Sequence, residues 1–438
     1  MGVDEGSPTS ITSELEQQFH QAWGALSPGG KVLLAVSGGP DSMALMLLVQ
    51  SLPHSAAEDV AVATVDHGLR PESREEAEFV AETAAQLGLS HTILSWQGPK
   101  PATGQMAAAR SARYRLLIEH ANEIGARGLV TGHHAGDVVE TFLMRLSRGS
   151  GLDGLAEMTR RRTIAAIGLR PITLIRPLLT QPKAALRVYV QSKGVIAIDD
   201  PSNENDAYER PRMRALAATL DDQGLASTAI ATSAQRLAAD AVERKRAEED
   251  RLRRLGGVFY GWGGASCEAR RMSPVDDKHL FARLCRAIVG APYAPDTDAV
   301  EAALSEALDG RLATIGGAMI ARRQDTVWVF REPAGVLGRK SEDRPVFAAP
   351  LNLAAGQSML WDRRFVIENR SGSTMVIQPF GADRSLPPTF VGPKLAAQSA
   401  PVLTGAGEAS PLTDPEGTWR VLAKVRFFDD LWVLDAGN

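Results

Sequence analysis

The chain has 438 residues, of which 44% are hydrophobic and 23% are charged, and its formal net charge is −4. This composition excludes a disordered or fibrous protein, and the length predicts two or three domains. The negative net charge argues against a generally basic nucleic-acid-binding protein, and no apolar run is long enough to cross a membrane.

Short β-rich runs alternate with helical patterns through the first half of the chain. The expected strands are residues 31–36, 60–66, 91–96 and 127–132, with a weaker one at 195–199, and the expected helices are 41–52, 73–87, 105–124 and 136–146. This alternation predicts an α/β fold with a doubly wound parallel sheet. Ligands bind such sheets at the carboxyl ends of the strands. We therefore expect the turn at Ser37, Asp66-His67 and His133-His134 to gather at one edge.

The second half of the chain is expected to be helical first and β-rich later. An Ala-, Arg- and Glu-rich segment predicts a long connecting helix that ends near Leu255, followed by further helices, and alternating runs after a linker at 331–345 predict strands. The predicted domains are a catalytic domain at 1–215, a helical domain at 216–335 and a small β-rich domain at 345–438.

The turn Ser37–Ser42, with the sequence S-G-G-P-D-S, joins the first strand to the first helix. Glycine-rich turns of this kind expose backbone N–H groups to phosphate, and the helix N-terminus adds partial positive charge. The turn lacks the lysine of a Walker A loop and the glycine spacing of a Rossmann fingerprint. It resembles the S-G-G-x-D-S signature of the pyrophosphatase-loop family of ATP-using enzymes. That resemblance implies ATP binding by Ser37, Gly38, Gly39, Pro40, Asp41 and Ser42.

Asp41 is an unusual residue in a phosphate-binding turn, because a carboxylate repels phosphate. Its presence is explained if Mg²⁺ bridges the carboxylate to the phosphates. The alternative is an ordinary acidic residue in the first turn of a helix, where negative charge is stabilising. We expect Asp41 to be a Mg²⁺ ligand.

Further motifs follow the turn in a definite order. They occupy residues 65–73, 108–117, 131–155, 175–179, 199–203 and 210–214. Together they resemble the tRNA(Ile)-lysidine synthetases over about residues 31–214. The resemblance implies an enzyme that uses ATP and free lysine to convert the wobble cytidine of the CAU-anticodon tRNA(Ile) into lysidine. The reaction would pass through an adenylated base and release AMP and pyrophosphate.

The same resemblance suggests roles for residues beyond the turn. Asp41, Arg113, Asp137 and Glu140 are the expected catalytic residues, and His133 is expected to contact ATP. Either Asp137 or Glu140 would meet the lysine amine, and the sequence leaves open which one does. Arg113 would stabilise charge on the reacting base or phosphate, with a surface ion pair as its alternative role. His133 has the alternative of a structural histidine at a strand end.

Basic residues are concentrated between Thr141 and Ala215, where there are 13 Lys or Arg and 7 Asp or Glu. Such a stretch is either a solvated surface or a polyanion-binding surface. A tRNA substrate favours the second interpretation, so we expect tRNA to be bound by Arg145, Arg148, Arg210, Arg212 and Arg214. A homodimer is left open.

Two motifs depart from the family pattern. The usual H-H-x-D-D-x-x-E-T appears as residues 133–141 with Gly136 in place of the first acidic residue, and the usual R-N-x-I-R has Pro211 and Met213. The glycine puts activity in doubt if that carboxylate is indispensable, although Asp137 and Glu140 are kept.

Three alternatives to the synthetase share the same turn. A tRNA thiolase needs catalytic cysteines, and the only cysteines, Cys267 and Cys285, lie outside the catalytic half. An amide-forming ligase of small molecules would leave the arginine-rich motifs unexplained, and a non-enzymatic ATP-binding scaffold is favoured only by Gly136. The two widely spaced cysteines exclude a disulfide framework, so a cytoplasmic protein is expected.

Overall fold

The computed structural model describes most of the chain in two compact units. The described residues are 8–53, 59–97, 100–101, 104–166, 169–198, 209–291, 293–337, 350–405, 408–410, 412, 419–422 and 432–434. The units are Met1–Glu243 with Val433–Asn438, and Arg244–Trp432. The motif at 199–203 lies outside the described residues, and the predicted domain boundaries stay a prediction. Among the residues described, no helix is long and apolar enough to span a membrane.

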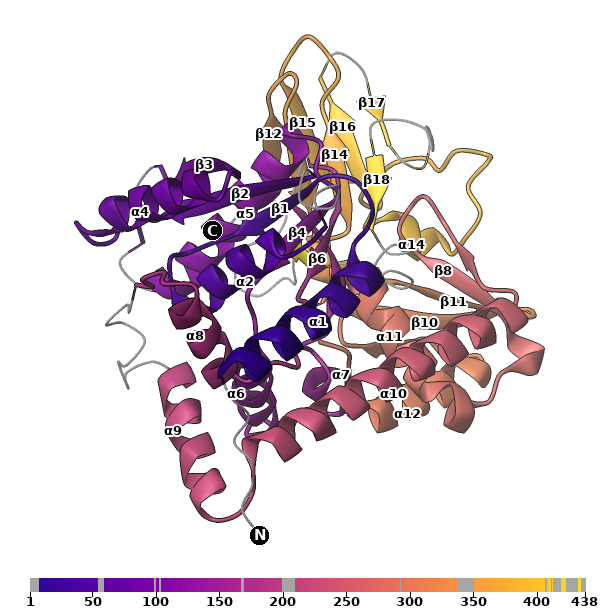
Figure 1. Cartoon of the computed structure of the whole chain (residues 1–438). Helices are drawn as coiled ribbons and strands as arrows, with labels where there is room; N and C mark the ends of the chain where they lie inside the picture. The colour runs from indigo at the N-terminus through magenta and orange to yellow at the C-terminus, as the bar shows by residue number, and fades with distance from the viewer. Residues whose placement is uncertain are drawn as a thin grey trace. The chain divides into compact units, whose positions relative to one another are not determined.

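The first unit is built on a mostly parallel sheet with the strand order β19-β5-β6-β4-β1-β2-β3 (Figure 1). The strands are β1 (Val32–Ala35), β2 (Val60–Asp66), β3 (Ser90–Ser95), β4 (Gly128–Thr131), β5 (Arg161–Ala166), β6 (Ile172–Ile175) and β19 (Trp432–Leu434). Strands β1, β2, β3, β4 and β6 run parallel, whereas β5 is antiparallel to β6. Every residue of β1 and β4 is buried, as is typical of parallel strands covered on both faces. The predicted α/β fold is confirmed.

Helices cover both faces of this sheet (Figure 1). Residues of α1, α2, α4 and α8 share one apolar core with Val32, Leu34 and Val130 of the sheet. Helix α5 contacts β1, β2 and β4 and has its own buried residues, such as Leu117 and Ile118. The helices of this unit are α1 (Pro8–Leu26), α2 (Pro40–Gln50), α4 (Ser73–Gln86), α5 (Gln105–Glu123), α6 (Ala135–Leu146), α7 (Leu152–Leu155), α8 (Lys183–Ser192), α9 (Glu209–Asp222) and most of α10 (Ser227–Arg254).

The strand predicted at 195–199 is wrong over its described residues, 195–198, which follow α8 without regular structure. The N–H of Ile198 donates a hydrogen bond to the carbonyl of Gly38 at 2.9 Å. The apolar residues of this segment therefore cover the Ser37–Ser42 turn instead of extending the sheet. The sheet is extended by β6 and β5, which the sequence analysis did not predict.

The second unit combines helices with three sheets. Its helices are α11 (Pro274–Val289), α12 (Thr297–Leu308), α13 (Ala334–Leu337), α14 (Lys394–Ala397) and the short 3₁₀ helix at Ala269–Arg271. A five-stranded sheet has the order β7-β8-β11-β10-β9, and two smaller sheets have the orders β12-β15-β16-β17 and β13-β14-β18. The segment predicted as a helical domain therefore also carries a sheet.

The strands of the second unit are short, and they pair antiparallel. They are β7 (Val258–Phe259), β8 (Ala265–Glu268), β9 (Ala313–Ile315), β10 (Ala318–Arg323), β11 (Thr326–Arg331), β12 (Leu351–Leu353), β13 (Ser358–Trp361), β14 (Phe365–Glu368), β15 (Met375–Pro379), β16 (Pro401–Thr404), β17 (Glu408–Ala409) and β18 (Trp419–Val421).

The end of β4 lies directly against the start of α2. A Cβ atom built on Gly132 would lie 2.8 Å from the backbone oxygen of Asp41 and 3.1 Å from the Cα of Ser42. Both obstacles are backbone atoms, which cannot rotate away. Glycine at 132 therefore sets how closely the turns after β1 and β4 approach each other.

We predict that Gly132→Ala lowers the stability of the first unit, because the added methyl forces apart two packed backbone segments. The expected loss is about 1–3 kcal/mol, the usual cost of overpacking. Thermal unfolding would show it as a lower Tm. Gly24→Ala is the matched control, because no atom lies within 4 Å of the added Cβ. An equal Tm for the two variants would contradict the role of Gly132.

Candidate active site

The turn between β1 and α2 is held open by its own hydrogen bonds. The hydroxyl of Ser42 accepts a hydrogen bond from the N–H of Ser37 at 3.1 Å and donates one to the carbonyl of Gly39 at 2.9 Å. Gly38 has a φ of +89°, and a Cβ there would lie 2.7 Å from the side chain of Ile198. Pro40 begins α2, whose first N–H groups have no partner within the helix. The N–H groups of Ser42 and Met43 donate instead to the carbonyl of Gly39 at 3.1 and 3.0 Å. The turn therefore offers an anion the partial positive charge at the N-terminus of α2.

Asp41 points from this turn toward the beginning of α6. Its Oδ2 lies 3.4 Å from Nε2 of His134, while its Oδ1 is buried and has no hydrogen-bond partner. His134 itself is 5% exposed. The sequence analysis chose His133 and passed over His134, although both follow the same strand. The orphaned oxygen of Asp41 is a vacant acceptor at the mouth of the turn.

His134 also caps α6. Its Nδ1 accepts a hydrogen bond from the N–H of Gly136 at 2.9 Å, and the carboxylate of Asp137 accepts one from the N–H of His134 at 2.9 Å. This reciprocal pair is a capping box. Because Nδ1 is an acceptor, the ring proton is on Nε2, which faces Asp41. Burial opposes protonation of His134, but its contacts with Asp41 and Asp137 raise its pKa.

Gly136 is required by this arrangement. A Cβ on Gly136 would lie 2.6 Å from Cε1 and 3.0 Å from Nδ1 of the His134 ring. The imidazole of His134 therefore occupies the space that a side chain at position 136 would need. Glycine, the departure from the family pattern, leaves this space free.

Asp137 and Glu140 lie on α6 and are paired with arginines of α9. Arg210 is 3.7 Å from Asp137, and Nε of Arg214 donates to Oε1 of Glu140 at 2.9 Å. Glu140 is 4% exposed, and its Oε2 is buried without a partner. Burial raises the pKa of Glu140, with Arg214 only partly opposing it. Burial also acts to raise the pKa of Asp137, but the neighbouring histidines and Arg210 lower it overall.

His133 and Arg113 lie on the other side of the β4 end. Nδ1 of His133 is 2.7 Å from the hydroxyl of Thr131. Burial lowers the pKa of His133 to about 3, and the charges of Arg176, Arg110 and Arg113 act in the same direction, against Asp137. His133 is therefore neutral near pH 7. Burial also lowers the pKa of Arg113.

The structure thus brings together six of the predicted positions and adds His134. The turn at Ser37, Asp41, His133, Asp137 and Glu140 follow strands or begin helices at one edge of the sheet, and Arg113 is close enough to His133 to affect its pKa. Asp66 is the last residue of β2 and His67 follows it, at the same edge, as expected from the parallel arrangement.

The arginines predicted to bind tRNA are mostly engaged with carboxylates. Arg145 forms an ion pair with Glu157 and Arg148 with Glu209, in addition to the pairs of Arg210 and Arg214 already described. Arg212 is exposed on α9. Their role in RNA binding stays a prediction.

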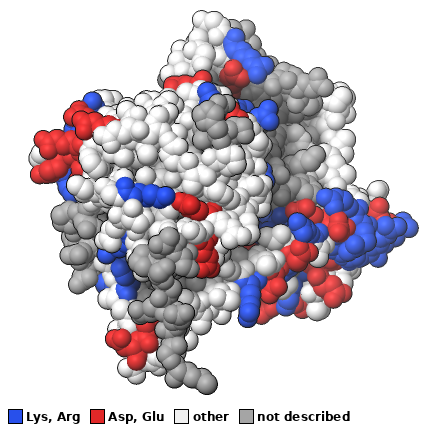
Figure 2. All heavy atoms as spheres, in the orientation of Figure 1, with Lys and Arg blue, Asp and Glu red and all other residues white. Residues whose placement is uncertain are grey.

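A separate concentration of basic residues belongs to the second unit. Figure 2 shows Lys and Arg gathered where α10 ends. The exposed arginines there include Arg253, Arg270 and Arg271, whose side chains are 61%, 80% and 65% exposed. Each of the three has an acidic neighbour, so this surface is mixed in charge.

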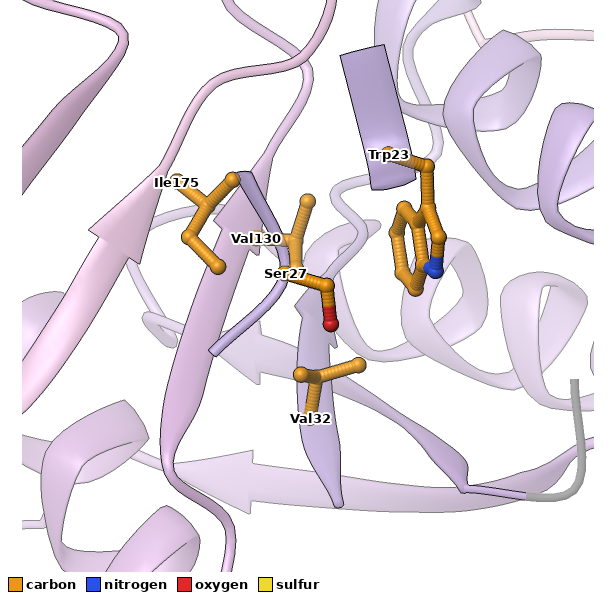
Figure 3. Close-up of a pocket in the computed structure, with 5 residues that line it drawn as sticks. All are labelled: Trp23, Ser27, Val32, Val130 and Ile175. Carbon is orange, nitrogen blue, oxygen red and sulfur yellow. The ribbon is translucent and has the colours of Figure 1, made fainter. Parts of the chain in front are cut away.

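A small apolar pocket in the first unit is distinct from these residues. It is lined by Trp23, Ser27, Val32, Val130 and Ile175, so its only polar side-chain groups are the hydroxyl of Ser27 and the indole N–H of Trp23 (Figure 3). This lining does not suit a charged ligand.

Among the residues described, no group of three or more His, Cys, Asp or Glu side chains could hold a metal ion. The unpartnered, buried Oδ1 of Asp41 nevertheless fits one oxygen ligand of a divalent cation. The other ligands would have to come from a bound polyphosphate and water.

Comparisons with known proteins place this geometry in a family. A family model described as a PP-loop domain matches residues 9–219. A tRNA(Ile)-lysidine synthase from Methylobacterium nodulans is 39% identical over 321 residues, which are 70% of this chain and 93% of that protein.

Two further relatives carry the same name. The protein from Brucella ovis is 36% identical over 360 residues, covering 80% of this chain and 77% of that protein. The one from a Bradyrhizobium species is 49% identical over 210 residues, covering 47% of this chain and 57% of that protein. The match of 49% identity to the Bradyrhizobium protein thus spans only about half of this chain and of that protein.

Stability should depend on pH through His67. Burial and the charge of Arg113 lower the pKa of His67 to about 4, whereas the unfolded chain binds this proton near pH 6.5. Between these values the unfolded state binds more protons, so stability contributed by neutral His67 is lost as the pH falls from about 6.5 to 4. We predict that the Tm of His67→Gln falls less steeply than that of the parent from pH 7 to pH 5. Parallel curves would contradict this assignment.

Gly136→Ala should displace the His134 ring from its cap. Losing an N-cap costs about 1 kcal/mol, so we predict a Tm lower by a few degrees in thermal unfolding. Gly151→Ala is the control, because Gly151 lies at a helix start as the N-cap of α7, has a negative φ and has open space around the added Cβ. If both variants unfold at the parent temperature, the ring does not depend on Gly136.

Proposed function

This chain belongs to the tRNA(Ile)-lysidine synthase family, and we propose that it ligates free lysine to ring position 2 of a wobble cytidine, using ATP. The RNA would be a tRNA(Ile) with a CAU anticodon. One observation carries the proposal: His134 contacts both Asp41 of the phosphate-binding turn and Asp137 of α6. That contact joins an anion-binding turn to a pair of carboxylates that suit an amine.

The first step would activate the base. The carbonyl oxygen at ring position 2 of cytosine attacks the α-phosphate of ATP, an O–P bond forms, and the bond to pyrophosphate breaks. The turn Ser37–Ser42 and the N-terminus of α2 hold the leaving pyrophosphate. Asp41 would hold Mg²⁺, which when bound offsets the negative charge of the phosphates. Arg113 would stabilise charge on the reacting groups.

The second step would transfer lysine. The side-chain amine attacks ring carbon 2, a C–N bond forms, and the C–O bond to AMP breaks. The amine must lose its proton, although its reference pKa is near 10.4. Asp137, whose pKa is lowered, suits the role of holding the ammonium group, and Glu140, whose pKa is raised, suits that of proton acceptor. His133, which is neutral near pH 7, is proposed to contact the nucleotide.

The RNA must present its base outside the stack. Anticodon bases are already splayed from a loop, so reaching the ring carbonyl costs little. Arg145, Arg148, Arg210, Arg212 and Arg214 are proposed to contact the RNA backbone. Those in ion pairs would then exchange a carboxylate for a phosphate.

The cysteines do not support a thiolase. Burial raises the pKa of both Cys267 and Cys285 to about 12, so neither thiol ionises near pH 7. Both also lie in the second unit.

The proposed reaction can be tested with isotopically labelled lysine, ATP and a tRNA(Ile) transcript carrying the CAU anticodon. We expect label in the RNA, with AMP and pyrophosphate formed, and no label when the wobble cytidine is replaced by uridine. ATP hydrolysis without transfer of lysine would refute the proposal.

Asp41→Asn removes the negative charge that would attract a cation to the turn but keeps the shape of the side chain. We predict that lysine transfer falls on the order of a hundredfold or more, the scale of losing a preorganised electrostatic group. The Tm should change little. Asp59→Asn, an exposed carboxylate before β2, is the control. Parent-like rates in Asp41→Asn would rule out the proposed cation site.

A further inference from the structure

Three arginines, Arg110, Arg113 and Arg176, lie close enough to His133 to affect its pKa, and Arg162 of β5 lies close enough to affect that of Arg176. We call these four residues the arginine cluster. Arg176 follows β6 directly, and the register Val130↔Ile175 places it level with Thr131, two residues before His133. Arg110 lies over the ring of Tyr114 at 5.3 Å, and Tyr114 also hydrogen-bonds Arg176. Arg176 belongs to the motif at 175–179, to which the proposed reaction assigns no role.

Arg176 is held firmly but without a counter-charge. Its side chain is 5% exposed, one guanidinium nitrogen donates to the carbonyl of Thr159 at 2.7 Å, and its Nε is buried without a partner. Burial and the charges of Arg162 and Arg110 lower its pKa. No carboxylate forms a salt bridge with Arg176 or Arg113 within the described residues.

The neighbouring arginines behave differently. Arg145, Arg148, Arg210 and Arg214 each face a carboxylate, and even Arg162 lies 4.0 Å from Glu157. A guanidinium keeps its charge when buried, and a buried charge without a partner is strongly unfavourable. Arg176 is such a charge, and Arg113, which is half-buried, lies on α5 next to Tyr114, which hydrogen-bonds Arg176. We infer that the missing partner of Arg176 is a ligand.

We propose that Arg176 and Arg113, supported by Arg110 and Tyr114, form a subsite for a phosphate group. The choice of phosphate rests on the proposed function, whose substrates carry it on both the nucleotide and the RNA backbone. The planar guanidinium matches phosphate oxygens in a two-pronged geometry. Tyr114 orients Arg176, so that its unpartnered Nε remains available. The nucleotide and the RNA backbone both present phosphate oxygens, and binding experiments can distinguish between them.

The test compares Arg176→Gln with Arg127→Gln in binding and thermal unfolding. Arg127 is exposed before β4, at the opposite edge of the same sheet. Affinities would be measured separately for ATP, for an anticodon stem-loop RNA and for lysine, and Tm would be measured with and without inorganic phosphate. None of these readouts requires lysine transfer, so they remain informative if the proposed reaction is not observed.

We expect Arg176→Gln to unfold at the parent temperature or above it, because a buried charge is removed. Its affinity for ATP or for the stem-loop should fall about tenfold or more, the scale of a charge-assisted hydrogen bond. A loss confined to ATP assigns the subsite to the nucleotide, and a loss confined to RNA assigns it to the backbone. Arg127→Gln should match the parent, and inorganic phosphate should raise the Tm of the parent more than that of Arg176→Gln.

Arg176→Lys keeps the charge but loses the planar fork, so its affinity should lie between those of the parent and Arg176→Gln. If Arg176→Gln does not fold, the same measurements on Arg176→Lys and Arg113→Lys decide the question. The proposal is overturned if ATP and RNA affinities stay unchanged in these variants, or if lysine is the only ligand whose affinity falls. A loss of lysine affinity alone would indicate that Arg176 and Arg113 bind the carboxylate of lysine.

Discussion

The close approach of two strand-to-helix turns is the constraint on which the site depends. Gly132 allows the end of β4 to lie against the backbone of Asp41 and Ser42, and no larger residue fits there without displacing that backbone. As a consequence, His134 at the start of α6 reaches the carboxylate of Asp41. The turn after β1 and the carboxylates of α6 thereby lie together at one edge of the sheet.

Charge is distributed unequally across this edge. On the α6 side, buried carboxylates have arginine partners from α9, so the ligand-free site is balanced. On the other side, Arg113 and Arg176 have no acidic partner in the described chain. Burial lowers the pKa of His133, and the charges of these arginines act in the same direction. An ammonium group suits the first side and an anion suits the second. A reaction that brings an amine to a phosphorylated base needs both environments close together.

The sequence predicted the sheet well because its first four strands are short apolar runs closed by glycine or polar turns. Parallel strands also determine where their carboxyl ends meet, so the positions of Asp41, His133 and Asp137 followed from the strand assignments. The predicted strand at 195–199 is wrong over residues 195–198, where the apolar run covers the turn. Strands β5 and β6 were not predicted, because their pairing joins residues brought together only by the fold. His134 was missed because two adjacent histidines look alike in sequence. His134 caps α6 because it directly precedes the first residue of the helix, and the sequence does not show where the helix begins.

Gly136 links this omission to the family pattern. An acidic side chain at 136 would compete with the His134 ring for the space above the first turn of α6, since a Cβ there lies 2.6 Å from the ring. With glycine, the imidazole caps the helix through Nδ1 and directs Nε2 at Asp41. Compared with the family pattern, the site has one carboxylate fewer, at position 136. The protonated Nε2 of His134 lies beside the carboxylate of Asp41. Asp41 Oδ1 is buried without a hydrogen-bond partner and fits one oxygen ligand of a divalent cation. Glycine at 136 therefore leaves room for the His134 ring beside Asp41, and Asp41 keeps an unpartnered oxygen that a cation would need.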